Sequence, residues 1–384
     1  MQAGGGGTDA STMGMRLTLH AARVCALALV VAGSTAAPAS ADLLLGLQDD
    51  ALLTSPEPQA WTVAQQLGPK VIRFNVAWEQ VAPTQPVNAD DPADPAYSFA
   101  NADLMAQKTA EIGAQSMFSI VNGTPWANGG REPRYMPSAL EFGRFCGVVA
   151  RRYSGTFTPA GATAPLPAVK KFTVWNEPNR GQYFFPQGRK GAVAAKNFAT
   201  LVAACVPAIK AVSPDAVVAP GPLASRPDKR KDVGGSPPIE FLKMYKAAGG
   251  PKPQVLAYNP YMNGLLPQYK PKETTKDGAI TLRNLDQLQG WLKRNYRRTT
   301  PLWFTEFAWR TAPTPRLGNV TPEQQAALTQ RTIELVRRRY PYVQIFTWFL
   351  LRDQDQSGYW RSGLVTFDWQ LKPAFQVYQA EATH

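Results

Sequence analysis

Two glutamates in this chain each follow a short apolar segment. Residues 171–175 lead through Asn176 to Glu177 and a proline, and residues 302–305 lead to Glu306. Both segments are rich in aromatic and β-branched residues, which favour buried β-strands. Each carboxylate is therefore expected at the end of a strand. The pattern predicts a reaction that depends on two carboxylates, with an amide beside one of them.

The scarcity of histidine limits the chemistry that these carboxylates can accompany. The chain has two histidines, His20 and His384, near its two ends. A Ser-His-Asp or Cys-His site therefore has no base in the body of the chain, and a histidine-ligated zinc site is equally disfavoured. We expect neither a metal nor a cofactor.

Eight apolar or β-branched segments alternate with helical patterns after residue 42. The expected strands are residues 43–47, 71–77, 115–121, 171–175, 216–219, 255–258, 302–305 and 344–349. Their nearly continuous apolar character is typical of parallel strands covered on both faces. Eight such units predict an α/β fold, a (β/α)8 TIM barrel over residues 42–384. A doubly wound sheet is disfavoured because residues 46–50 contain one glycine and no phosphate-binding turn.

Helical patterns and loop lengths place the site at one end of this barrel. Apolar residues at spacings of three and four predict helices around 142–153, 198–212 and 282–296. Thr321–Gln324 has the sequence of a capping box, which opens a helix that ends near Arg339. The long connections all follow strands. In a barrel they lie at the C-terminal face, where active sites are found.

On the predicted barrel, Glu177 ends the fourth strand and Glu306 ends the seventh, 129 residues later. Side chains three strands apart on an eight-strand ring can face each other across the mouth. In a retaining glycosidase the two carboxyl groups stand roughly 5–5.5 Å apart, one as nucleophile and the other as acid and then base. The pair predicts this mechanism. The alternative is two structural glutamates that pair with barrel arginines.

Three residues near the expected strand ends fit supporting roles. Arg73 lies inside an apolar strand and needs an anionic partner; Glu306 is the candidate, and the pairing would keep a nucleophile ionised. Asn176 can bond a sugar hydroxyl beside the reacting carbon, and Tyr261 can orient the nucleophile. Glu177 must stay protonated near the working pH, so we expect its surroundings to raise its pKa.

Aromatic residues lie at or just beyond several expected strand ends. Trp126, Trp309 and Trp348 are candidates for packing against the apolar faces of a sugar. Any single tryptophan at such a position can equally belong to the core. Several on one rim favour a saccharide cleft.

Together these segments resemble glycoside hydrolases of clan A, the retaining barrel enzymes with catalytic glutamates on strands four and seven. Residues 174–179, Val-Trp-Asn-Glu-Pro-Asn, look like their acid/base signature, and residues 303–307 look like their nucleophile strand. The resemblance implies the acid/base role for Glu177 and the nucleophile role for Glu306. It is closest to family 39, then family 5.

Further positions extend the resemblance, and one departs from it. Residues 72–78 are similar to the second strand with its arginine, and Trp348 matches the tryptophan commonly found at strand eight. Many clan members have histidine where Asn259 stands. Asparagine can still donate and accept hydrogen bonds to a substrate, but it cannot carry charge. The resemblance runs from about residue 43 to the C-terminus.

The N-terminal region has the pattern of a secretory signal peptide. Arg16 and Arg23 precede an apolar stretch, and a small-residue site ends at Ala41, where we expect cleavage and secretion. The alternative is an uncleaved anchor; no second apolar segment is expected to cross a membrane. In the exported protein, Cys146 and Cys205 can form a disulfide or remain buried thiols.

The chain is basic, with a net charge of +13 over 384 residues. Removal of residues 1–41 deletes two arginines and one aspartate and leaves +12. This charge favours acidic partners, including an anionic glycan. Basic runs at 226–231, 293–298 and 337–339 are expected to be solvated faces rather than a nucleic-acid site. The sequence predicts a secreted glycosidase acting on a β-linked oligo- or polysaccharide. A non-catalytic carbohydrate-binding barrel and a transglycosylase are the alternatives.

Overall fold

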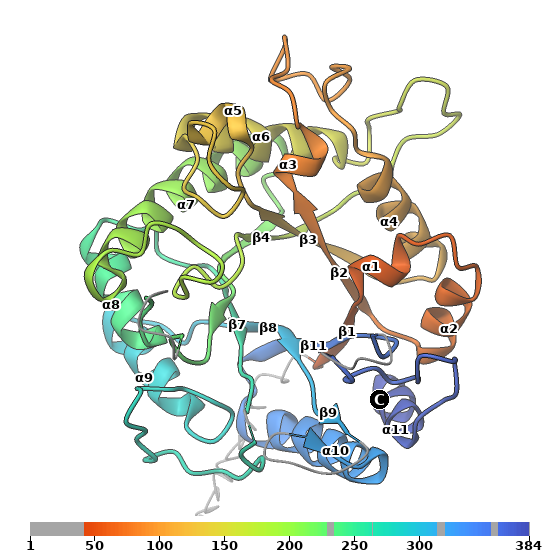
Figure 1. Cartoon of the computed structure of the whole chain (residues 1–384), viewed down its shortest axis with the longest axis vertical. Coiled ribbons are helices and arrows are strands. Elements are labelled where there is room, and N and C mark those ends of the chain that lie inside the picture. The colour runs from red at the N-terminus through yellow and green to blue at the C-terminus, as the bar shows by residue number, and fades with distance from the viewer. Residues whose placement is uncertain (1–41, 229–233, 263, 313–318, 355–359, 384) are drawn as a thin grey trace, which may run out of the picture. The chain divides into compact units, whose positions relative to one another are not determined.

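The computed structural model describes residues 42–228, 234–262, 264–312, 319–354 and 360–383. The predicted signal peptide at residues 1–41 lies outside the described residues, and the start of the domain at residue 42 stays a prediction. In the described part of the chain, a ring of β-strands is surrounded by helices (Figure 1).

The strands and helices alternate along the chain. The strands are β1 (Leu44–Gln48), β2 (Val71–Ala77), β3 (Gln115–Val121), β4 (Lys171–Val174), β5 (Val217–Pro220), β6 (Leu223–Ala224), β7 (Leu256–Asn259), β8 (Leu302–Phe307), β9 (Arg310–Thr311), β10 (Asn319–Val320) and β11 (Val343–Phe349). The helices are α1 (Asp50–Leu53), α2 (Gln59–Leu67), α3 (Trp78–Val81), α4 (Ala100–Glu111), α5 (Pro125–Asn128), α6 (Ala139–Arg152), the 3-10 turn η1 (Arg189–Gly191), α7 (Ala192–Val212), α8 (Pro238–Ala247), α9 (Leu285–Tyr296), α10 (Pro322–Arg339) and α11 (Pro373–Ala382).

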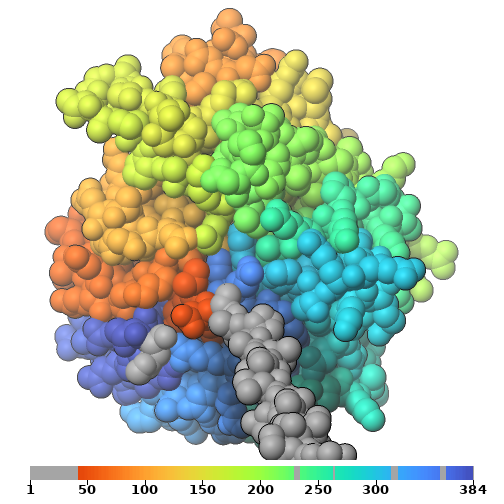
Figure 2. Space-filling view, turned by 180° about the vertical axis from the view of Figure 1, so that it is seen from behind, coloured from red at the N-terminus to blue at the C-terminus, as the bar shows by residue number. Residues whose placement is uncertain are grey.

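The main sheet is parallel, in the order β5-β4-β3-β2-β1-β11-β8-β7-β6. β1 pairs with β11, and Figure 2 shows the first described residues in red beside blue residues from the last part of the chain. β5 pairs with β4, and β6 pairs with β7. β5 and β6 are the two ends of this sheet order, and only two residues of the chain separate them. This short connection closes the ring. The fold is an α/β TIM-like barrel, and each of the eight predicted strands is present within two residues of its predicted bounds.

The join between β5 and β6 needs a glycine. Gly221 has φ +93°, and a Cβ there would lie 2.8 Å from the backbone nitrogen of Leu223 and 3.0 Å from the carbonyl oxygen of Ala257. Only glycine adopts this backbone conformation without strain. The next carbonyl, that of Pro222, accepts a hydrogen bond from the backbone N–H of Glu177 at 2.8 Å. The join is thus tied to the turn that carries the first candidate carboxylate.

Two groups of buried apolar side chains stabilise the barrel. The larger lies between the strands and the surrounding helices. The smaller comes from the strands and their immediate neighbours: Val71, Met117, Ala219, Val255, Ala257, Trp303 and Ile345. Inward-facing layers of this kind fill TIM-like barrels. Arg73 lies two residues beyond Val71 on the same face of β2. A layer of polar side chains around Arg73, here the polar layer, therefore begins directly above this apolar layer.

The predicted helices are present as α6, α7, α9 and α10. The predicted capping box opens α10: Thr321 Oγ1 accepts from the N–H of Gln324 at 3.2 Å, and Gln324 Oε1 accepts from the N–H of Thr321 at 3.0 Å. The basic run 337–339 lies in the last turn of α10, where cations offset the helix dipole.

Among the described residues, one helix has the length and apolar composition of a membrane span. Residues Arg189–Val212, which form η1 and α7, are long enough and apolar enough to cross a membrane by composition. Leu201, Val202 and Cys205 of α7 are nevertheless fully buried in the core between strands and helices. The apolar face of α7 is therefore occupied by packing within the barrel, and its composition is that of a core helix.

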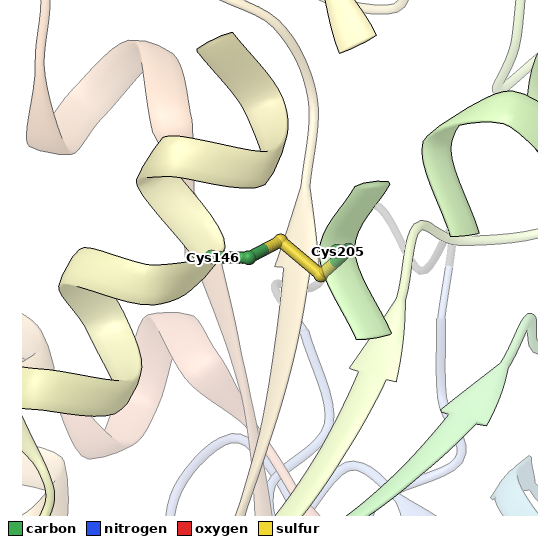
Figure 3. The surroundings of a disulfide bond; sticks show 2 residues. All are labelled: Cys146 and Cys205. Carbon is green, nitrogen blue, oxygen red and sulfur yellow. A yellow bond between two sulfur atoms is a disulfide. The ribbon is translucent and has the colours of Figure 1, made fainter. Parts of the chain in front are cut away.

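Cys146 of α6 and Cys205 of α7 form a disulfide, which the sequence left open (Figure 3). The sulfurs are 2.06 Å apart and both side chains are fully buried. The bond joins two neighbouring helices on the outside of β3 and β4, across 59 positions of sequence.

We expect the disulfide to contribute about 2–4 kcal/mol to the free energy of unfolding, because it limits the conformations of the unfolded chain. Urea unfolding of the protein with and without reductant measures this contribution. The variant with both Cys146→Ala and Cys205→Ala serves as control, since its stability should not respond to reductant. Equal midpoints for oxidised and reduced protein would contradict the prediction.

Candidate active site

The guanidinium of Arg73 lies at the centre of the polar layer and is completely buried. Its Nη1 donates to Glu306 Oε1 at 2.6 Å and to Gln48 Oε1 at 2.6 Å. Its Nε donates to Ser119 Oγ at 2.8 Å, and its Nη2 donates to Asn176 Oδ1 at 3.2 Å. The predicted pairing of Arg73 with Glu306 is therefore present. The contacts connect β1, β2, β3, β8 and the turn after β4.

A β-bulge turns Glu306 toward the mouth of the barrel. Phe304 pairs with Phe346 and Phe307 pairs with Trp348, so three steps along β8 match two steps along β11. Without the extra residue, strand alternation would place Glu306 on the same face as Phe304, which packs against the helices. The bulge instead brings its carboxylate to the face that carries Arg73.

Both oxygens of Glu306 are held by the protein. Oε1 accepts from Arg73, and Oε2 accepts from the Tyr261 hydroxyl at 3.2 Å. Tyr261 thus contacts Glu306, as predicted from the sequence. The Glu306 side chain is 13% exposed, so it is held firmly yet can be reached from the mouth.

Glu177 lies on a constrained turn beyond β4. Trp175 and Glu177 both have positive φ, +68° and +42°, which is uncommon for residues with a side chain. Asn179 anchors the turn: its Oδ1 accepts from the N–H of Ala224 at 2.8 Å, and its Nδ2 donates to the carbonyl of Ser236 at 3.1 Å. Strained backbone of this kind persists where its surroundings fix it, and it is frequent at active sites.

The carboxyl group of Glu177 is buried, with 4% of the residue exposed. Oε1 accepts from Asn259 Nδ2 at 3.0 Å, and Oε2 accepts from Arg180 Nη1 at 3.0 Å. Burial raises the pKa of Glu177; the charge of Arg180 opposes this rise, and the charge of Glu306 adds to it. The net direction is upward, which suits a proton donor.

Arg180 and Asp228 belong to the site, although the sequence reasoning missed both. Arg180 Nε and Nη2 donate to Asp228 Oδ1 at 2.9 and 2.5 Å, while Nη1 binds Glu177. Arg180 stands three residues after Glu177, a spacing that could have drawn attention to it. Asp228 lies in a run interpreted as a solvated face, and only the folded loop brings it beside Arg180.

Two adjoining cavities open at this end of the barrel, and the candidate carboxylates line the second of them. The first, here the β1–β4 cavity, has a volume of about 510 Å3. Its lining residues lie on or after β1 to β4 and include Asp50, Asn75, Glu79, Asn122, Asn176 and Tyr183. The second, here the β6–β11 cavity, has a volume of about 440 Å3. It is lined by Glu177, Arg180, Tyr183, Arg226, Tyr261, Glu306, Trp309 and Trp360, among others. Tyr183 lines both, so the two cavities adjoin.

Two of the three tryptophans expected at the rim are placed differently. Trp348 is fully buried, and its Nε1 donates to the carbonyl of Ser362 at 2.9 Å. The prediction that it contacts substrate is wrong, because strand alternation points it toward the helices. Trp126 packs edge-on against Trp78, donates to the carbonyl of Ala82 at 2.9 Å, and lines neither cavity. Trp309 does line the β6–β11 cavity.

Solved structures share this fold at low sequence identity. A family 39 glycoside hydrolase from Bacteroides cellulosilyticus WH2 matches with a TM-score of 0.62 and 19% identity over 90% of this chain and 64% of that chain. A glucosidase from Croceicoccus marinus matches with a TM-score of 0.63 and 15% identity over 89% of this chain and 66% of that chain. A family 1 β-glucosidase from Thermotoga maritima matches with a TM-score of 0.57 and 14% identity over 89% of this chain and 97% of that chain.

These matches establish the class of fold. The chain spans 64–66% of the length of the first two structures. No protein-family model matches the sequence, and no curated protein matches it. At these identities the likeness shows that the chain has the α/β barrel fold found in clan A glycoside hydrolases of families 39 and 1.

The carboxyl group of Asp50 in the β1–β4 cavity should make stability depend on pH. Burial raises its pKa from 3.8 to about 6, although Arg73 opposes the rise. Because the folded state holds this proton more tightly than the unfolded state, the barrel loses stability as pH rises from about 4 to about 6. Asp50→Asn should remove a cost on the order of 1–3 kcal/mol at pH 7.5 and little at pH 4.

Urea unfolding of Asp50→Asn and of the parent protein at both pH values measures this difference. Glu111→Gln, on an exposed carboxylate paired with Lys108, is the matched control and should show no such pH dependence. A difference between Asp50→Asn and the parent that is equal at pH 4 and pH 7.5 would show that burial does not raise the pKa.

Proposed function

We propose that this protein is a retaining glycoside hydrolase that cleaves a β-linked oligo- or polysaccharide, with Glu306 as nucleophile and Glu177 as acid and base. One observation carries the proposal: two glutamates, one on the turn after β4 and one on β8, line one cavity and have contrasting surroundings. Glu306 is paired with a guanidinium at 2.6 Å, whereas burial raises the pKa of Glu177. This contrast matches the two roles in double displacement.

In the first step, Glu177 gives its proton to the glycosidic oxygen while Glu306 attacks the anomeric carbon. The bond from that carbon to the leaving oxygen breaks, and an ester to Glu306 forms. Arg73 and Tyr261 fix the two oxygens of the nucleophile. Asn176 Oδ1 accepts from Arg73, so its Nδ2 remains to donate to a hydroxyl beside the reacting carbon.

In the second step, the Glu177 carboxylate takes a proton from water as the water oxygen attacks the anomeric carbon, and the ester to Glu306 breaks. A sugar hydroxyl in place of water gives transglycosylation with the same residues. Tyr183, Trp309 and Trp360 line the β6–β11 cavity beside the carboxylates. Their rings supply apolar surface for the faces of sugar units on that side.

We also propose that the protein is exported. The N-terminal signal pattern motivates this, and the Cys146–Cys205 disulfide supports it, because such bonds persist in oxidising compartments. N-terminal sequencing of protein recovered outside the producing cells tests the proposal. The expected first residue is Asp42.

Incubation with 2-fluoro glycosides that carry an activated leaving group tests the catalytic assignment. A panel covering common pyranosides should include one that adds a single glycosyl mass to a peptide containing Glu306. Glu306→Gln should not be labelled, and Glu177→Gln should lose about 10²–10⁴-fold in turnover of substrates that need protonation. Labelling of another residue, or glycan binding without cleavage by the parent protein, would overturn the assignment; the second result would favour a carbohydrate-binding barrel.

Removal of the Arg180 charge should shift the pH dependence of kcat/KM. The guanidinium opposes the burial that raises the pKa of Glu177, so Arg180→Met should raise that pKa further. The alkaline limb, where Glu177 loses its proton, should then move to higher pH. Arg144→Met, on an exposed residue of α6 paired with Glu141, should leave the profile in place. A limb that stays or moves to lower pH would show that Arg180 does not act on Glu177 in this way.

A further inference from the structure

Two carboxylates of the β1–β4 cavity each carry one buried oxygen without a hydrogen-bond partner in the described part of the chain. Asp50 Oδ2 accepts from Asn75 Nδ2 at 2.6 Å, whereas Oδ1 has no partner. Glu79 Oε1 accepts from Asn122 Nδ2 at 2.8 Å, whereas Oε2 has none. Buried acceptors in folded proteins are nearly always paired. The two oxygens are therefore free to accept from a donor outside the chain, such as a ligand group.

Neither carboxylate forms an ion pair among the residues that the structure describes. Arg73 and Arg134 each already pair with another carboxylate: Arg73 binds Glu306 at 2.6 Å, and Arg134 binds Glu132 at 2.5 Å. Burial raises the pKa of both Asp50 and Glu79, so the fold bears a cost for placing them there. The charge of Arg73 offsets only part of the cost at Asp50. A cationic ligand in this half-buried cavity would stabilise the remaining negative charge.

The other polar side chains of the cavity are neutral or already paired, and they connect it to the reaction. Asn75, Asn101, Asn122 and Asn176 supply amides, and Tyr183 supplies a hydroxyl. Asn176 precedes Glu177 in sequence and bonds Arg73. Through Asn176 and Tyr183, this cavity adjoins the one that Glu177 and Glu306 line.

We propose that the β1–β4 cavity is a subsite for a sugar residue that carries a free amino group, with the ammonium facing Asp50 and Glu79. The proposal rests on the proposed function, because it takes the ligand to be a glycan. An ammonium group supplies up to three donors and a positive charge, which matches both carboxylates. A hydroxyl pairs with an orphan oxygen but leaves the charge in place. A uronate would add a third negative charge to this cavity. The net charge of +12, which favours an anionic glycan, therefore does not describe the preference of this cavity.

Binding of simple glycosides to the intact protein tests this subsite without any turnover. The probes are the methyl β-glycosides of glucosamine, N-acetylglucosamine and glucose, which differ only at carbon 2, and the same three in the galacto configuration. We expect one of the two amines to bind at least about tenfold more tightly than its acetylated and neutral counterparts, about 1.4 kcal/mol. Chemical-shift changes on titration give the affinities.

Charge-neutral variants of similar shape complete the test. Asp50→Asn and Glu79→Gln should each reduce the preference for the amine severalfold, and the double variant should abolish it. Glu240→Gln, on an exposed residue of α8 that pairs with Lys243, should keep it. Thermal unfolding confirms that each variant is folded.

Three results would overturn the proposal: equal binding of amine and neutral glycosides, a preference that survives the double variant, or no binding of either amine. Failure of the proposed function is read separately, from the labelling of Glu306. An amine preference without labelling would retain the subsite on a non-catalytic barrel. Labelling without an amine preference would retain the glycosidase and remove the subsite.

Discussion

The buried guanidinium of Arg73 is the group on which the rest of the site depends. A cation enclosed in a barrel is stable only with an anion beside it and with its N–H groups satisfied. Arg73 meets this requirement through groups from distant parts of the chain: Gln48 on β1, Ser119 on β3 and Glu306 on β8. The order of the polar layer and the position of Glu306 therefore rest on the same interactions.

Several groups at the mouth of the barrel lower the stability of the fold, and packing elsewhere in the barrel offsets this loss. Burial raises the pKa of Asp49 and Asp50 to about 6 and also raises that of Glu177. The turn before Glu177 holds Trp175 at a positive φ. Such groups persist because the apolar layers and the disulfide between α6 and α7 stabilise the structure around them. Proteins commonly accept local destabilisation where chemistry requires it.

Much of the site was predictable because its chemistry follows from residue types. A buried arginine needs a carboxylate, which led to the pairing of Arg73 with Glu306, and Tyr261 was correctly placed beside the same group. The tryptophans were less predictable. An indole at a strand end can face the mouth or the helices, and Trp348 faces the helices. Arg180 pairs with Glu177, three residues before it, and also with Asp228 on another loop; no local pattern predicts the second contact.

The sequence by itself determined the eight strands, the order of the β/α units and the chemical groups carried near the strand ends, because apolar periodicity and capping are local properties. Tertiary structure alone decided which side of its strand Glu306 faces, since the bulge in β8 is defined only by pairing with β11. It also decided the environment of Glu177, through the turn that Asn179 anchors. The unpaired carboxylate oxygens of Asp50 and Glu79 also depend on the fold. A total charge can be counted along a chain, but a local field depends on which groups the fold brings together.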